Sequence, residues 1–306
     1  MLDKLCELNV NHNLIKWIYS YLTERPQYVK LHDVTSNWLY TNTGAPQGCV
    51  LSPLLFTLYT NDCLSSYTNC HILKYADDTV IIGNITDNDT NTYLQQVNNF
   101  VKWCADNYLN LNVKKTMEMV FDFRKDKNVH DPLIIKNETV LFTKCYKYLG
   151  VHIDDKLDFS ENIHNLYKKC LQRVRHLREL VNIRVDKDIL SLFYRSIIES
   201  VLTYSIVSWF GSSHKKDQKK LKKIIRIGKK LGVCTRSLND LFNEYCIKKV
   251  VKLLKDSEHP LYDQYVFLRS GKRLMVPKQR TNRYGNTFVP SSIKLYNYHL
   301  TKGKTM

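Results

Sequence analysis

Two adjacent aspartates, Asp77 and Asp78, interrupt an apolar run, ILKYADDTVIIG, that spans residues 72–83. Hard divalent ions such as Mg²⁺ take oxygen ligands, usually one or two carboxylates together with substrate phosphates. The pair could therefore bind a divalent cation, which would offset the repulsion between the two charges. An exposed hairpin tip without a ligand explains the pair as well, so the two residues alone leave both interpretations open.

The residues around the pair predict a β-hairpin. β-Branched and aromatic residues, which favour strands, precede and follow the aspartates in two runs separated by two residues. This spacing predicts Asp77-Asp78 as the two-residue turn. Asp-Asp is an uncommon choice there, because the turn positions favour positive φ and Asn-Gly or Asp-Gly is usual.

The net charge of +17 is concentrated in the C-terminal half of the chain. Residues 1–150 contain 14 Lys or Arg and 15 Asp or Glu, whereas residues 151–306 contain 32 and 14, so the net charges are −1 and +18. Such asymmetry favours a polyanion-binding half joined to a near-neutral half. A lysine surface that only improves solubility is the alternative.

The nine cysteines indicate an intracellular protein with reduced thiols. Their number is odd, no Cys-x-x-Cys motif occurs and no signal peptide opens the chain, so disulfides, structural zinc and secretion are disfavoured. We expect a location in the nucleus or cytoplasm. No apolar run looks long enough to cross a membrane, since even residues 196–211 include Glu199.

The periodicity of apolar residues predicts an α+β unit followed by a helical unit, with the boundary near residue 155. The chain has 306 residues, of which 43% are hydrophobic, enough to fill such cores. The first unit should contain two helices within residues 2–22, a third from Pro53 to about Leu64 with Ser52 as its N-cap, and a fourth over 90–108. Its strands are expected near 28–31, at 117–123 and, as a pair, within 145–154. The second should contain helices over about 160–181, 189–204 and 214–230.

Four stretches resemble, in order, motifs of the reverse transcriptases of non-LTR, LINE-type retrotransposons: GAPQGCVLSP (44–53), YADD (75–78), LNVKKTMEM (111–119) and YKYLGVHID (146–154). YADD alone would be a weak signal, but four motifs in the family's order are specific. The stretch Arg25-Pro26-Gln27 and the tail RTNRYGNTFVPSSIKLYN (280–297) are also similar to elements of the vertebrate type related to L2, CR1 and Rex. The resemblance spans essentially the whole chain and implies an RNA-directed DNA polymerase.

The resemblance also implies a role for each matching residue. Asp77 and Asp78 would be catalytic ligands of Mg²⁺ or Mn²⁺, because nucleotidyl transfer uses two divalent ions about 4 Å apart. Lys115 would lie near the triphosphate and could protonate the leaving pyrophosphate, with a solvated lysine as the alternative. Substrate contacts would come from Pro46, Gln47, Gly48 and Tyr75, and the primer end would be held by Tyr148, Leu149 and Gly150. The partners would be an RNA template, a DNA primer and deoxynucleoside triphosphates.

One element of the family is missing from the expected site. Relatives carry another metal-binding aspartate on a strand before the helix that corresponds to residues 2–8, whereas this chain opens with MLDKLCELNV. The resemblance therefore implies an N-terminally truncated remnant, inactive on its own, whose Asp77 hairpin has lost its neighbouring strand. It would comprise a partial palm domain with an antiparallel sheet over residues 1–155, a basic helical thumb-like domain over 156–255 and a basic tail over 256–306.

Two other functions stay open as alternatives. A nucleic-acid-binding module without catalysis would use the helix over 214–230, with Leu221, Ile224, Ile225 and Leu231 facing inward. The expected outward residues are Lys216, Lys219, Lys220, Lys223, Arg226 and Lys230.

The more remote alternative is an AlkB-like oxygenase that uses iron and 2-oxoglutarate. His152 and Asp154 have the His-x-Asp spacing of such iron sites, and the helix that follows is similar to a segment of AlkB-like proteins. That chemistry needs a β-sandwich, and the predicted helices after residue 160 argue against one.

Overall fold

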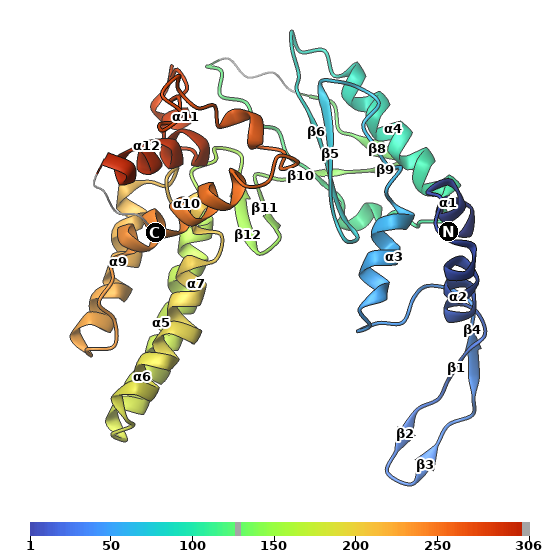
Figure 1. Ribbon diagram of the computed structural model, residues 1–306, viewed down its shortest axis with the longest axis horizontal. Coiled ribbons are helices and arrows are strands. Elements are labelled where there is room, and N and C mark those ends of the chain that lie inside the picture. The colour runs from blue at the N-terminus through green and yellow to red at the C-terminus, as the bar shows by residue number, and fades with distance from the viewer. Residues whose placement is uncertain (126–129, 302–306) are drawn as a thin grey trace. The chain divides into compact units, whose positions relative to one another are not determined.

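The computed structural model describes residues 1–125 and 130–301, which form two compact units (Figure 1). Of the described residues, unit 1 contains 1–116 and 130–140, and unit 2 contains 117–125 and 141–301. Helices and short strands are mixed in the chain, as the predicted α+β class requires. The predicted boundary near residue 155 lies inside unit 2, and the assignment of palm, thumb and tail to particular ranges stays a prediction.

Unit 1 combines short helices with β-hairpins. Its helices are α1 (Leu2–Glu7), α2 (His12–Leu22), α3 (Leu51–Tyr59), α4 (Asn91–Asp106) and the 3₁₀ turn η1 (Val113–Lys115). Its strands are β1 (Arg25–Gln27), β2 (Lys30–Leu31), β3 (Val34–Thr35), β4 (Leu39–Thr41), β5 (Cys70–Tyr75), β6 (Asp78–Gly83), β8 (Ile134–Ile135) and β9 (Glu138–Thr139).

Unit 2 is mainly helical. Its strands are β7 (Met117–Glu118), β10 (Leu141–Phe142), β11 (Cys145–Tyr148) and β12 (Val151–Asp154). Its helices are α5 (Ser160–Asn182), α6 (Lys187–Phe193), the π-helix η2 (Tyr194–Glu199), α7 (Ser200–Thr203), α8 (Ile206–Trp209), α9 (Lys215–Lys230), α10 (Leu238–Leu253), the 3₁₀ turn η3 (Tyr262–Gln264), α11 (Asn282–Gly285) and α12 (Phe288–Thr301).

The strands pair only in twos. Across residues 1–125 and 130–301 there are six two-stranded sheets, five antiparallel and one, β7 with β10, parallel. The single antiparallel sheet expected for a palm is therefore not formed by the described residues, and its assignment as a palm stays a prediction. The strand expected over 117–123 is wrong beyond Glu118, and of the strand expected near 28–31 only Lys30-Leu31 is extended and paired.

The helix after the glycine-rich loop begins and ends earlier than its sequence predicts. It runs from Leu51 to Tyr59 with Val50 at the N-cap, rather than from Pro53 to about Leu64 with Ser52 as N-cap. The Ser52 hydroxyl instead donates to the carbonyl oxygen of Pro46 at 2.5 Å, so it fastens the preceding loop and leaves the helix end uncapped. By contrast, α2 is capped by Asn11, whose side chain accepts from Asn13 N at 2.9 Å.

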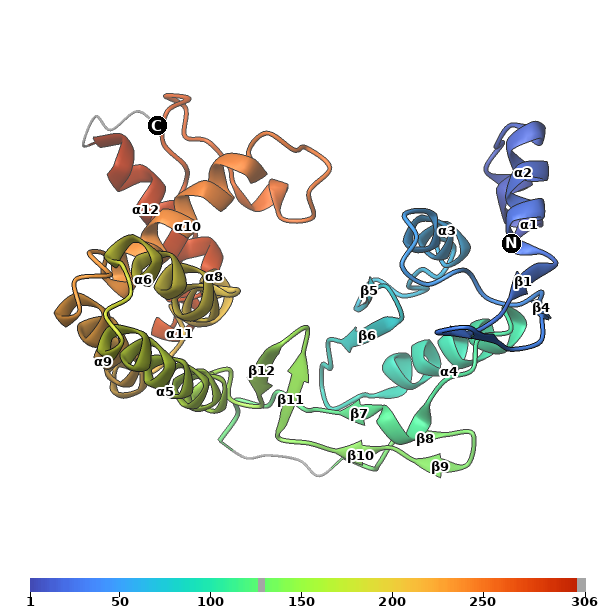
Figure 2. The same cartoon turned by 90° about the horizontal axis from the view of Figure 1, so that it is seen from below.

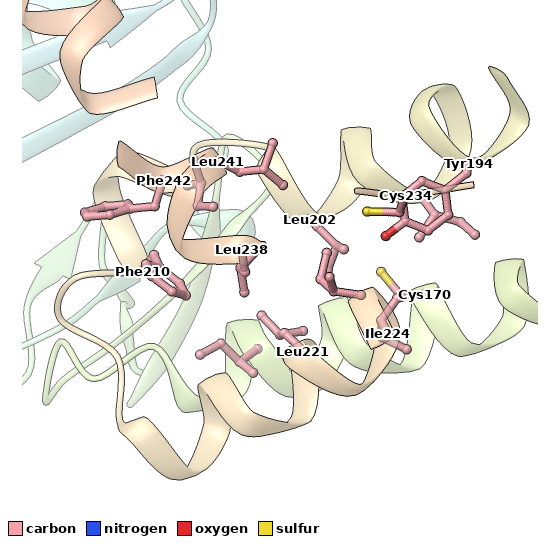
Figure 3. Close-up of a cluster of buried hydrophobic side chains, with 14 of the residues drawn as sticks. Cys170, Tyr194, Leu202, Phe210, Leu221, Ile224, Cys234, Leu238, Leu241 and Phe242 are labelled. Atoms are coloured by element: carbon pink, nitrogen blue, oxygen red, sulfur yellow. The ribbon is translucent and has the colours of Figure 1, made fainter. Parts of the chain in front are cut away.

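The core of unit 2 is formed by α5, the helical stretch from α6 to α8, α9 and α10. Figure 3 shows Leu202, Leu221 and Ile224 from this core pointing toward one another, and all three are completely buried. Helices α5 and α9 lie side by side in both overall views (Figures 1 and 2). This packing leaves the opposite side of α9 in solvent.

A π-helical segment lies in the middle of the stretch from α6 to α7. Four residues at a strict spacing of four, Leu190, Tyr194, Ile198 and Leu202, are all buried in the same core. The π-helix covers Tyr194–Glu199, and Glu199, which is also buried, forms an ion pair with Arg236. The π-helix, whose turns are wider than those of an α-helix, therefore lies where the buried residues recur every four positions.

The C-terminal segment is part of unit 2 and packs against α10. Val250 and Leu253 of α10 form a buried cluster with Tyr265, Leu274 and Ile293. Tyr265 Oη and Ser292 Oγ share a buried hydrogen bond of 2.9 Å. Residues 256–301 thus contribute to a hydrophobic core.

One helical stretch, Lys187–Trp209, has the length and apolar composition of a membrane span. The expectation that no run reaches that length is therefore corrected. Tyr194, Ile198, Leu202 and Trp209 in this stretch are completely buried by the rest of unit 2, which is how a core helix of a folded domain is placed.

Replacing Gly228 with alanine should destabilise unit 2. A Cβ at this position would lie 2.6 Å from Cε2 of Tyr194 and 3.0 Å from Cβ of Cys234, and Tyr194 is fully buried. Alanine favours a helix over glycine by about 1 kcal/mol, but overpacking a core costs about 1–3 kcal/mol, so we expect a net loss of about 1 kcal/mol. Chemical denaturation measures it. Lys219→Ala on the exposed side of α9 is the control, and a Gly228→Ala protein as stable as wild type would contradict the packing.

Candidate functional site

The hairpin that carries the aspartates is confirmed, but its turn is displaced by one residue. Strands β5 and β6 pair from Cys70 with Gly83 to Tyr75 with Asp78, so Ala76 and Asp77 form the turn. Ala76 has φ of +51°. Asp78 is therefore the first residue of β6, opposite Tyr75, and the expected Asp77-Asp78 turn is wrong.

The register of the hairpin separates a packed side from an open side. Ile81 packs against the cluster around Val97 of α4. Because side chains alternate along a strand, Tyr75, Asp78 and Leu73 share the other side. Tyr75 is 63% exposed and Leu73 is 49% exposed, and both outer edges of the hairpin are unpaired within the described residues. Asp78 thus lies on an exposed side of the hairpin that also carries the apolar groups of Leu73 and Tyr75.

Asp77 and Asp78 are both exposed and adjacent, as ligands of a solvent-accessible cation must be. In the described parts of the chain, however, no cluster of three or more His, Cys, Asp or Glu side chains could hold a metal ion. Two carboxylates can supply some of the oxygen ligands of a Mg²⁺ ion, with substrate phosphates supplying others. They do not provide the full ligand set of two ions.

The end of α3 anchors the hairpin, through residues that the motifs did not identify. The Lys74 ammonium, one residue before Tyr75, donates to the carbonyl oxygen of Thr60. Lys4 of α1 donates to Tyr59 O at 2.7 Å and to Asp62 Oδ1 at 2.6 Å. Trp103 of α4 donates its indole N–H to the second oxygen of Asp62 at 3.2 Å. The spacing of a motif could not have revealed these contacts, because they join residues far apart in the chain.

The GAPQG loop is a constrained turn before α3. Gly44 and Gly48 have φ of +67° and +77°, a left-handed conformation that favours glycine. Pro46 is half-buried and is held through its carbonyl by Ser52, whereas Gln47 and Gly48 are exposed. The expected substrate residues of this loop are therefore on an accessible surface, in the same unit as the hairpin.

Cys49, in the same loop, has an unusual environment that the motif alone did not predict. Its Sγ lies 2.9 Å from Ser52 Oγ and 2.6 Å from Tyr21 Oη, and Ser52 N donates to it at 3.3 Å. The hydroxyl of Ser52, followed by that of Tyr21, lowers the pKa of the Cys49 thiol to about 7. All nine cysteines of the chain are free.

Lys115 ends the 3₁₀ turn η1, where the side chain of Asn112 accepts a hydrogen bond from its backbone N–H at 3.2 Å. Its side chain is exposed and forms no ion pair within residues 1–125 and 130–301. Lys115 and the aspartates belong to the same unit. A role at the triphosphate stays a prediction.

The strand pair expected within 145–154 is confirmed as β11 and β12. Tyr148 pairs with Val151, and Leu149 and Gly150 form the turn with φ of +44° and +84°. Tyr204 fixes this turn, donating from Oη to Leu149 O at 2.7 Å. This hairpin belongs to unit 2, so its suggested role at the primer end stays a prediction.

Five of the exposed residues of α9 form a basic stripe along one side of the helix, which we define as Lys216, Lys219, Lys223, Arg226 and Lys230. Leu221, Ile224 and Ile225 are buried, and Leu231 packs beside them, as expected. Lys220 differs from the expectation, because it is only partly exposed and pairs with Asp217 at 2.7 Å. The stripe members form no ion pairs with described residues, so their charges are available to a ligand.

The suggested iron residues are not joined by a second histidine. His152 and Asp154 lie on one side of β12, and Asp154 Oδ1 accepts from Asp158 N at 2.9 Å. The residues that follow are the helices α5, α6 and η2. The described structure thus provides two candidate iron ligands here and no third.

The reactivity of Cys49 should depend on pH in the neutral range. The thiolate is the nucleophile, so alkylation of Cys49 should rise with pH through a midpoint near 7. The Ser52 hydroxyl has one hydrogen, which can go to Pro46 O or to the Cys49 sulfur. Ser52→Ala and Tyr21→Phe each remove a hydroxyl that can donate to the Cys49 thiolate, so each should move the midpoint upward. Mass spectrometry of iodoacetamide-treated protein measures labelling of the Cys49 peptide, with buried Cys170 as an unreactive internal control. Equal midpoints in all three proteins would contradict the assigned cause.

Comparison with known families gives two matches. The family described as reverse transcriptase (RNA-dependent DNA polymerase) matches residues 2–153. The family described as alkylated DNA repair protein alkB homolog 8, N-terminal, matches residues 159–200, which form α5, α6 and η2. No solved structure is significantly similar to the chain.

Curated relatives agree with the first family. A probable RNA-directed DNA polymerase from transposon BS of Drosophila melanogaster is 27% identical over 172 residues, which are 53% of this chain and 19% of the relative. The RNA-directed DNA polymerase from mobile element jockey of the same species is 25% identical over 204 residues, 62% of this chain and 22% of the relative. A probable RNA-directed DNA polymerase from transposon X-element, also from that species, is 28% identical over 161 residues, 51% and 18% of the two chains.

The chain spans about a fifth of the length of these relatives. The family match includes the GAPQG loop, the YADD hairpin, Lys115 and the turn at Gly150. Residues 2–153 therefore match the reverse transcriptase (RNA-dependent DNA polymerase) family, and the retrotransposon relatives support a LINE-type reverse transcriptase.

Proposed function

We propose that this chain is a segment of a retrotransposon RNA-directed DNA polymerase that acts inside the cell on an RNA template, a DNA primer and deoxynucleoside triphosphates. The observation that supports it best is the YADD hairpin, which presents Asp77 and Asp78 to solvent in a unit that also contains the GAPQG loop and Lys115. When bound, Mg²⁺ or Mn²⁺ would supply the charge that stabilises the transferred phosphoryl group.

In this proposal the chain's own residues bind and position substrates. Asp77 and Asp78 contribute carboxylate oxygens to the cation, and the Gly44 and Gly48 turns hold the loop backbone open to a nucleotide. The aromatic ring of Tyr75, beside Asp78 on the open side of the hairpin, offers a surface for a primer-terminal base or sugar. Lys115 would neutralise triphosphate charge.

The chain alone is proposed to lack polymerase activity. The transfer reaction needs two divalent ions, and two neighbouring carboxylates cannot fix both in the required geometry. Both outer edges of the hairpin are unpaired within the described residues, and a further strand from an N-terminally extended chain could pair with one of them. We propose that such an extension supplies the third carboxylate.

Primer extension tests this division of the site. The 306-residue chain, given Mg²⁺ or Mn²⁺, an RNA template and an annealed DNA primer, should give no extension above background. A version extended at its N-terminus by the corresponding strand of a relative should gain activity, and Asp77→Ala should then abolish it because a metal ligand is lost. Asp78→Asn should reduce activity less, because it retains one oxygen ligand.

Two results would refute the proposal. Extension by the unextended chain that Asp77→Ala abolishes would show that its carboxylates suffice. Equal activity of the extended wild type and its Asp77→Ala variant would remove Asp77 from the site. Thr86→Ala, in a loop outside the hairpin strands, is the control variant. It should keep the activity of the extended wild type, which shows that substitution and purification alone do not remove polymerase activity.

A nucleic-acid-binding module without catalysis is the second candidate function, and the α9 stripe favours it. Five cationic side chains without described carboxylate partners follow one side of a helix whose opposite side is buried. Such a row can track the phosphates of a backbone without reading bases. The same surface would hold template and primer if the polymerase proposal is correct.

The α9 stripe should make binding steeply dependent on salt. Each phosphate neutralised contributes roughly 0.7–0.9 to the slope of log affinity against log salt concentration. Replacing Lys219, Lys223 and Arg226 with glutamine should therefore flatten that slope by about two. Fluorescence anisotropy with a labelled RNA–DNA hybrid at several salt concentrations measures it.

Lys249, Lys252 and Lys255, which are exposed in or just after α10, give a control triple variant with the same change in charge. Its slope should change less than that of the α9 variant. If both triple variants change the slope equally, net charge and not the stripe determines binding.

A further inference from the structure

The C-terminal segment contains a small cleft that belongs to none of the motifs. It has a volume of about 500 Å³ and is lined by Phe267, Gly271, Lys272, Arg273, Tyr296, Leu300 and Thr301. Two walls are aromatic, two residues are cationic, and no carboxylate lines it among the residues that the structure describes. The cleft thus combines flat apolar surfaces with unopposed positive charge.

The cleft is built on a fixed loop. Phe267 and Leu274 form an isolated β-bridge, Leu268 N donates to Arg273 O at 2.7 Å, and Met275 N donates to Val266 O at 2.7 Å. Gly271 closes the loop with φ of +66°, and a Cβ added there would meet no described atom within 4 Å. The left-handed backbone, and not crowding, is therefore the reason for glycine at this position. The short loop thus places Lys272 beside Gly271 and Arg273 at the backbone hydrogen bond that closes the loop.

Helix α12 anchors this loop through hydrogen bonds to Leu274. Asn297 accepts from Leu274 N at 2.9 Å and donates to Leu274 O at 2.8 Å, and Leu274 is completely buried. Tyr296, on the neighbouring position of α12, is half-buried and lines the cleft. The backbone that carries the aromatic and cationic walls is therefore held in place before any ligand binds.

The charge around the cleft is of one sign. No Asp or Glu follows Asp263 in the sequence. The described Lys and Arg residues after that point are Arg269, Lys272, Arg273, Lys278, Arg280, Arg283 and Lys294. Because no carboxylate in this segment can neutralise these side chains, the local field favours a polyanion.

We infer that this cleft binds an unpaired nucleotide of single-stranded nucleic acid. A base stacks against Phe267 and Tyr296, and its flanking phosphate lies on Lys272 and Arg273; aromatic surfaces beside cations are how proteins hold single strands without reading sequence. A duplex would offer the phosphates but keep its bases stacked away from the rings. The choice of nucleic acid over other polyanions rests on the proposed function.

Competitive binding to the full 306-residue chain tests the inference. A labelled single-stranded oligonucleotide and a duplex of the same sequence are titrated against wild type and Phe267→Ala. Loss of one stacking surface should weaken single-strand binding at least about fivefold and leave duplex binding within about twofold. Met275→Ala, an exposed apolar truncation in the same loop, is the matched control and should leave both affinities unchanged.

Two double variants with the same change in charge distinguish binding in the cleft from general electrostatic attraction. Lys272→Gln with Arg273→Gln should lower single-strand affinity and flatten its salt slope by about one. Lys278→Gln with Arg280→Gln removes the same charge from the same acid-free segment outside the cleft, and should have the smaller effect. Equal losses in the two pairs would overturn the inference in favour of charge alone.

Photocrosslinking uses the wild-type chain, so its result does not depend on whether the variants fold. Wild-type chain bound to a single strand that contains 5-iodouracil should give a crosslinked peptide that includes Phe267 or Tyr296. Crosslinks found only elsewhere, or a Phe267→Ala protein with unchanged single-strand affinity, would overturn the cleft. A wild-type chain that binds neither oligonucleotide would overturn the inference and the proposed binding function together, whereas binding without any Phe267 effect would overturn the cleft alone.

Discussion

The C-terminal end of α3 is the point on which unit 1 depends. Its last carbonyl groups have no partner within the helix, and cations are favoured beside them. Lys4 brings α1 to Tyr59 O, and Lys74 brings β5 to Thr60 O. Asp62 joins Lys4 to Trp103 of α4. Since Lys74 immediately precedes Tyr75, the same helix end that organises the unit also positions the aspartate hairpin.

The sequence was most informative where a local pattern determines the outcome. Two runs of β-branched and aromatic residues predicted the hairpin, and the spacing of Leu221, Ile224 and Ile225 predicted which side of α9 is buried. Both depend on neighbours a few positions away. The pattern failed by one residue at the turn, because composition does not determine whether Asp78 pairs across the hairpin or lies in its loop. It also misplaced the start of α3, where Ser52 bonds to Pro46 instead of capping the helix.

The remaining features come from contacts between distant parts of the chain. The Tyr21 contact with Cys49, the Tyr204 contact with Leu149 and the packing of Tyr265 against α10 join residues that no periodicity relates. The basic tail illustrates the difference. Its charge was evident from the sequence, but its role in a hydrophobic core and the cleft beside Phe267 required the fold.

The π-helix at Tyr194–Glu199 has a consequence for how this chain can change in length. In an α-helix each step of four residues passes a full turn by about 40°, so three steps from Leu190 would carry Leu202 about 120° around the helix. A wider turn reduces that drift, and all four residues reach one core. A π-turn holds one residue more than an α-turn. A single-residue deletion should therefore be absorbed best inside this segment, whereas elsewhere in the helix it would rotate one flank out of the core.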